Sequence, residues 1–138
     1  MAVITPVPLV MKDSIAKIAA DNFEAALSGV TITPTTPTYT FKGIGKNANY
    51  TAVGDPDWAC QLDYVQDWDT AGSLSNYLLA NVGKTVAIEF TPKAKSGRIF
   101  KANVTIVPGA IGGATNALAT TSVTLPCDAP VATAAPTA

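Results

Sequence analysis

The stretch Trp58–Pro108 decides the fold of this chain: WACQLDYVQDWDTAGSLSNYLLANVGKTVAIEFTPKAKSGRIFKANVTIVP. We divide it into a strand, an Asp-rich turn, a short helix, a strand, a turn with Pro, Lys and Gly, and a last strand. In the first strand Cys60, Leu62 and Tyr64 alternate with residues that are mainly polar, and the same period of two recurs over residues 86–90 and 100–106. Such a period is typical of strands with one buried face. The stretch therefore predicts a mainly β domain of the sandwich type.

One helix interrupts these strands. The apolar residues of LSNYLL, at positions 74, 77 and 78, have helical spacing. Ser73 can cap the first turn, and Gly83 stands just beyond the end. We expect a helix over about Ser73–Asn81.

The segment before the central stretch is ambiguous. Apolar residues at helical spacing and the Ala-rich composition slightly favour a helix over Ser14–Leu27, although Asp21-Asn22 is a turn signal. Val30–Thr33 is strand-like. Residues 1–10, which contain two prolines, predict an extended arm.

A long connection follows the short strand Tyr39–Phe41. Residues Lys42–Asp57 contain three glycines and no hydrophobic period, so we expect a loop that is functional or disordered. Gly43 and Gly45 do not form a phosphate-binding loop, because the third glycine and a Gly-Lys-Ser/Thr ending are absent. After Pro108 we expect a Gly-rich connection and a strand at about 121–125. A single domain then covers residues 1–126, and residues 127–138 form a low-complexity tail without ordered structure.

Composition restricts the classes of function. The chain has 138 residues, enough for one domain, and a net charge of −1, so it carries no electrostatic attraction for nucleic acid. Charged residues make up 14%, below the roughly 25% of an ordinary soluble domain. Such a surface suits a subunit that packs against copies of itself, although a generally Ala- and Thr-rich composition explains it equally well.

The N-terminal residues do not have the pattern of a signal peptide, and no apolar run is long enough to cross a membrane. We therefore expect synthesis in the cytoplasm, with Cys60 and Cys127 as free thiols.

Most site chemistry is excluded. The chain has no histidine, which removes Ser-His and Cys-His pairs and the common zinc motifs. A calcium loop starting at Asp67 fails at its fifth and twelfth positions, so Asp67 and Asp69 are better explained as turn residues before the helix. Trp58 and Trp68 are candidates for a sugar site or, more often, for core and interface positions. We expect no enzymatic activity, no metal and no cofactor.

The order of the motifs resembles the major tail proteins, or tail tube proteins, of long-tailed bacteriophages. The similarity lies in KDSIAKIA and LSGVTITP, in YTFKGIG at the start of the long loop, in the central stretch, and in TTSVTLP. It covers about residues 9–126. We favour the non-contractile type of tail.

The resemblance implies an antiparallel two-sheet sandwich or half-open barrel with one flanking helix. It also implies strands near Ile15–Ile18 and Ala25–Thr33, against the local helix preference. In this family six copies form a ring through their sheet edges, and the rings stack into a hollow tube through which DNA reaches the host. The implied partners are other copies, a tape measure protein and tail terminator or tip proteins, and the implied location is the virion, after assembly in the host cytoplasm.

Two sets of site residues follow from this hypothesis. A tube that passes DNA needs a polar lumen without free basic groups. Alternation in the central strands gives these lumen candidates, with the lysine as the exception: Gln61, Asp63, Glu89 and Lys101. The long loop is the candidate for contact with the next ring, with these residues: Lys42, Gly43, Gly45, Lys46, Tyr50 and Asp55. The alternative is a small β-sandwich module that binds carbohydrate or a cell surface through the tryptophans and aspartates.

Overall fold

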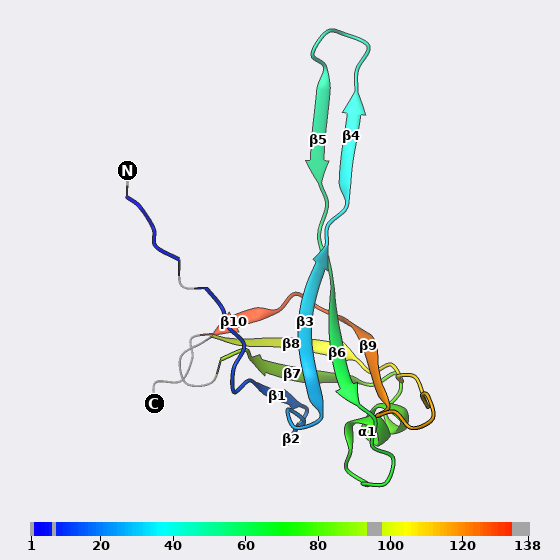
Figure 1. Cartoon of the computed structure of the whole chain (residues 1–138). Helices are drawn as coiled ribbons and strands as arrows, with labels where there is room; N and C mark the ends of the chain where they lie inside the picture. Colours follow the sequence, from blue (N-terminus) through cyan, green and yellow to red (C-terminus); the bar gives the residue numbers. More distant parts are fainter. Residues whose placement is uncertain (1, 7, 94–97, 134–138) are drawn as a thin grey trace.

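The computed structural model describes residues 2–6, 8–93 and 98–133 (Figure 1). In this part of the chain the elements are almost all strands, and the helix lies between the sixth and seventh of them. In chain order the elements are β1 Ile15–Ile18, β2 Asp21–Asn22, β3 Leu27–Thr35, β4 Thr38–Lys42, β5 Asn49–Val53, β6 Asp57–Val65, α1 Leu74–Ala80, β7 Thr85–Thr91, β8 Ile99–Thr105, β9 Thr120–Cys127 and β10 Val131–Thr133.

The main sheet has the strand order β2-β1-β7-β8-β9-β6-β3, and β10 pairs with β8 beside this path. All paired strands are antiparallel. Only one residue pair, Val104 with Cys127, joins β8 to β9, so the sheet divides there into two halves. In Figure 1, β3 and β6 run across β7 and β8. The sheet does not close, and the fold is a mainly β, antiparallel, half-open arrangement, as predicted.

The core lies between the two halves and confirms the predicted alternation. Cys60, Leu62 and Tyr64 of β6 are all buried, and they belong to one apolar cluster with Ile88 of β7 and Val104 of β8. Because every second residue of these strands is buried, the residues between them lie on the outer face.

The helix also agrees with the prediction. The side chain of Ser73 accepts a hydrogen bond from the backbone N–H of Asn76 at 3.3 Å, which caps the first turn. Leu74 and Leu78 are buried against the core. Gly83, just after the helix, has φ +84°, a conformation that glycine adopts without strain.

The segment 14–27 contains strands, so the local preference for a helix was wrong and the strands implied by the resemblance are confirmed. Strand β1 pairs with β7 along its whole length, and Ala16 and Ile18 point into the core. Ala19, with φ 56°, reverses the chain into β2. Pairing and burial outweigh the helix propensity of the alanines here.

Two further predictions need correction. Residues 42–57 were expected to form a loop, but β4 and β5 pair over five positions, from Thr38 with Val53 to Lys42 with Asn49, and make a hairpin.

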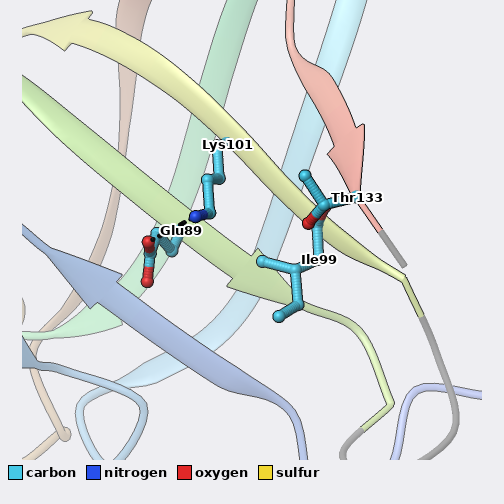
Figure 2. A network of polar contacts seen from close by, with 4 residues as sticks. All are labelled: Glu89, Ile99, Lys101 and Thr133. Atoms are coloured by element: carbon cyan, nitrogen blue, oxygen red, sulfur yellow. Dashed lines mark hydrogen bonds and ion pairs between the residues drawn. The ribbon is translucent and has the colours of Figure 1, made fainter. Parts of the chain in front are cut away.

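Residues 127–138 were expected to lack structure, but Cys127 ends β9, and β10 pairs with residues 99–101 of β8. Thr133 donates a hydrogen bond from Oγ1 to the carbonyl of Ile99 at 3.2 Å (Figure 2). Residues 134–138 of the predicted tail lie outside the described residues. At the other end of the chain, residues 2–6 and 8–10 are exposed without helix or strand.

Candidate assembly surfaces

The hairpin of β4 and β5, which we call the hairpin arm (residues 38–53), projects away from the rest of the structure (Figure 1). Two backbone hydrogen bonds extend its ladder: Gly54 donates to the carbonyl of Pro37 at 2.9 Å, and Gly43 donates to that of Ala48 at 2.6 Å. All ten residues of the two strands are exposed. At about 3.4 Å per residue the strands alone extend roughly 17 Å.

The two faces of the hairpin arm differ in chemistry. Tyr39, Phe41 and Tyr50 lie on one face and are 62–65% exposed. The rings of Phe41 and Tyr50 stack across the strands with centroids 6.2 Å apart. The opposite face carries the cross-strand pair Thr40 and Thr51. An aromatic face without cover is typical of a surface that binds another molecule.

The tip of the arm comprises residues 43–48. Of Gly43 and Gly45, which the sequence singled out, only Gly43 is required by the close packing of the tip. A Cβ on Gly43 would lie 2.7 Å from the Cβ of Ala48, so a larger residue would force the tip open. A Cβ on Gly45 would make only an ordinary contact at 3.9 Å. Asn47 has φ 62°, which completes the reversal of the chain. Ile44 projects fully into solvent at the end of the tip.

Of the residues predicted to contact a neighbouring ring, Lys42 and Tyr50 lie in the arm strands and Lys46 lies in the tip. Asp55 follows the arm at its base. The sequence interpretation missed Tyr39, Phe41 and Ile44. A signal for Phe41 was present, because Phe41 and Tyr50 stand at equal distances from a Gly- and Asn-containing turn, which is a hairpin pattern.

The four lumen candidates form two separate groups on the outer face of the sheet. Glu89 of β7 and Lys101 of β8 are cross-strand partners, and the Nζ of Lys101 lies 3.3 Å from the Oε1 of Glu89 (Figure 2). Both side chains are partly exposed, so the pair adds little stability, but each group offsets the charge of the other.

The second group is centred on Asp63 of β6. Its Oδ1 accepts hydrogen bonds from the Oγ of Ser122 and from the Nε2 of Gln61, the latter at 3.2 Å. In the order of the sheet, strand β9 lies between β8, which carries Lys101, and β6, which carries Gln61 and Asp63. The structure therefore joins Gln61 with Asp63 and Glu89 with Lys101, and does not bring the two pairs together.

The tryptophans do not form a shared platform. Trp58 is at the start of β6, half-buried, and Trp68 follows the other end of the strand. Seven residues of extended chain, about 23 Å, separate Trp58 from Val65, and Trp68 lies beyond it. One sugar ring cannot contact both side chains.

Asp67 has the turn role that the sequence predicted. Its Oδ1 accepts hydrogen bonds from the backbone N–H groups of Asp69 and Thr70, at 3.1 and 3.2 Å. Hydrogen bonds from the side chain and backbone of Thr70 lower the pKa of the Asp67 carboxyl, and the bond from Asp69 adds to them. Within residues 2–6, 8–93 and 98–133, no three His, Cys, Asp or Glu side chains are grouped closely enough to hold a metal ion.

The two cysteines are free thiols in the structure, as expected. Cys60 is buried in the core, and burial raises the pKa of its thiol to about 12, with a smaller contribution from nearby Cys127. Burial, followed by the charge of Asp128, also raises the pKa of the partly exposed Cys127. Neither thiol is activated as a nucleophile.

No protein-family model matches this chain, and no curated protein matches it in sequence. In the part of the chain that the structure describes, no helix has the length and apolarity needed to cross a membrane.

Proposed function

We propose that this protein is a structural subunit that forms hexameric rings with copies of itself, and that these rings stack as the tail tube of a long-tailed bacteriophage. The observation that carries the proposal is the hairpin arm, which projects from the body (Figure 1). One face of this arm exposes the aromatic side chains of Tyr39, Phe41 and Tyr50. A second copy of the chain is the simplest partner for this face, because no other molecule is then required.

The energetics of the arm support a role in assembly. A lone two-stranded hairpin is at best marginally stable in water. Its main internal side-chain contact is the stack of Phe41 on Tyr50, which contributes about 0.5–1.5 kcal/mol. An extended arm that keeps three aromatic side chains in solvent has no benefit for an isolated domain. Burial against a neighbouring subunit would supply the missing stabilisation.

The edges of the main sheet provide a second kind of contact. Strand β3 is nine residues long, and among the described residues it has a strand partner, β6, on one side only. Strand β2 ends the sheet at its other edge. Natural proteins usually block long free edges, because such edges pair with other chains. Head-to-tail pairing of two different edges by rotation generates a closed ring.

The outer face of the sheet is compatible with a DNA conduit. The lumen candidates are two carboxylates, one amide and one ammonium group, and the ammonium group of Lys101 is paired with Glu89. A phosphate backbone passing such a surface finds no unpaired cation among these four residues. Tape measure and tail terminator or tip proteins would then be the further partners, in the virion.

Electron microscopy of the purified protein, together with its sedimentation, tests the proposal. We expect rings or tubes of uniform width from the full chain. A variant in which residues 38–53 are replaced by a short Gly-Ser linker should remain folded, because the arm lies outside the core, but should not form tubes. A full chain that stays monomeric at every concentration would refute the proposal. Glycan binding by such a monomer would support the carbohydrate-binding alternative, which no observation in the structure favours.

A further inference from the structure

An apolar groove opens between the two halves of the main sheet. On one side it is lined by Val30 and Ile32 of β3 and Trp58 of β6, and on the other by Phe90 of β7 and Phe100 of β8. Residues of the N-terminal segment and two prolines complete the lining, and the volume is about 390 Å³. The groove is thus lined by apolar and aromatic side chains of four strands, of which Ile32, Trp58 and Phe100 are partly exposed.

A second hollow continues this groove. The two share Met11, Val30 and Phe90, and the second one also has Asp13, Lys12 and Glu24 in its wall. With two carboxylates and one ammonium group, this wall has a net charge of −1. The Oε2 of Glu24 is buried and accepts no hydrogen bond within the described part of the chain. A buried carboxylate oxygen without a donor is costly, so a cation or N–H donor from another molecule would stabilise it.

The tip of the hairpin arm has the complementary pattern. Ile44 is its fully exposed apolar side chain. Lys42 and Lys46 flank Ile44 at two residues on either side, and neither makes an ion pair with any other described residue. The tip therefore presents an apolar side chain between two ammonium groups, and the groove presents apolar walls beside two carboxylates.

We propose that the hairpin tip of one copy docks in this groove of a second copy. Ile44 enters the apolar groove, and Lys42 and Lys46 approach Asp13 and Glu24 in the adjoining hollow. The arm projects away from its own body, so its tip contacts the groove of another molecule (Figure 1). The inference rests on the proposed function and specifies the surface that receives the arm.

Charge reversal tests this pairing. The hairpin variant is Lys42→Glu with Lys46→Glu, and the groove variant is Glu24→Lys with Asp13→Asn. Asparagine is chosen because Asp13 has φ 53°, which asparagine tolerates and lysine does not. Each variant alone brings like charges together, so we expect the protein concentration needed for tubes to rise at least about tenfold. In a 1:1 mixture every hairpin finds a groove of opposite charge, and we expect tubes to return near the wild-type concentration.

The outcomes separate the two proposals. If the wild-type chain forms tubes but the 1:1 mixture of the two variants does not, the pairing of hairpin tip and groove is wrong, and the tail tube proposal remains intact. A wild-type chain that never assembles would refute both. Thermal unfolding checks that each variant is folded. If Glu24→Lys does not fold, Glu24→Gln with Asp13→Asn replaces it. Only the ammonium group of Lys12 then remains charged in the wall, so this groove should relieve the defect of the hairpin variant. If the hairpin variant assembles equally well with the wild-type groove and with the altered groove, the inference is contradicted.

Discussion

Removing two aromatic side chains from the hairpin arm should abolish assembly and leave the subunit itself stable. The variant is Phe41→Ala with Tyr50→Ala, which removes the stacked pair. In the free subunit the two residues are 64 and 65% exposed. A phenylalanine or tyrosine has about 150–250 Å² of surface to bury. Two-thirds of this, about 130 Å², is thus available to a partner at each residue. At about 25 cal/mol per Å² this gives roughly 3 kcal/mol each, and about 6 kcal/mol per subunit for the pair, as an upper value.

The assay compares assembly and subunit stability in the same samples. Sedimentation gives the concentration at which tubes form, and thermal unfolding monitored by circular dichroism gives the stability of the body. We expect the tubes to disappear at all accessible concentrations, while the unfolding temperature of the body stays within about 1 °C, because exposed residues outside the core contribute little to it.

The matched control is Thr40→Ala with Thr51→Ala, the cross-strand pair on the opposite face of the same two strands. This change alters β propensity at two similar positions but leaves the aromatic face intact, so tubes should form at close to the wild-type concentration. If both variants lose assembly to the same extent, general weakening of the hairpin explains the effect. Normal tubes from the aromatic variant would show that this face is not an interface.

Three further predictions concern the body. A Cβ on Gly109 would overlap the hydroxyl of buried Tyr64, so Gly109→Ala should lower the free energy of unfolding by about 1–3 kcal/mol in chemical denaturation, whereas Gly72→Ala, in open space, should have almost no effect. Equal stabilities for the two variants would contradict the packing at Tyr64. Cys127 should react with a thiol reagent in the folded protein, and Cys60 should react only after unfolding. The Cys60 thiol has a folded pKa of about 12 against about 8.5 in the unfolded chain, so its contribution to stability is complete below pH 8.5 and is lost as the pH rises towards 12. Cys60→Ala should flatten this alkaline loss, and an unchanged pH profile would contradict the assignment.

The central strands could be predicted because each has one buried and one exposed face. The alternation of apolar and polar residues around Leu62, Ile88 and Val104 follows from this difference between the faces, and all three side chains are buried. The helix could be predicted because its cap at Ser73 and its apolar stripe at Leu74 and Leu78 are local features. Both signals depend on near neighbours in the sequence, which is why single-sequence reasoning finds them.

Tyr39–Phe41 was expected as a short strand, but alternation did not predict its pairing with β5 in the hairpin arm, and it did not predict β10. Both faces of the arm are exposed in the free subunit, so no alternation of buried and solvated residues marks its strands. Val131–Thr133 is a strand because β8 lies beside it, and a short Ala- and Thr-rich segment carries no local sign of this. The same limit applies to β1, whose pairing with β7 connects residues at least 70 positions apart.

The candidate site was predicted in part. The sequence singled out the segment from Lys42 onwards, with Tyr50 in it, as a candidate contact, but it did not single out Tyr39, Phe41 or Ile44. Alternation placed Asp63 and Glu89 on the outer face, and the order of the strands then separated them, which depends on topology alone. Glu24 gave no sequence signal at all, since an unpaired buried oxygen is visible only in three dimensions.

The hairpin arm leaves the body in one direction only. If each arm docks in the groove of the next copy, every copy donates once and accepts once, so the filament has a head and a tail. One terminus displays unfilled grooves, and the other displays undocked arms. A factor that blocks the grooves would stop growth at the first terminus without affecting the second. Initiation and length control can therefore be assigned to two different proteins by surface chemistry alone, even though every subunit of the filament is identical.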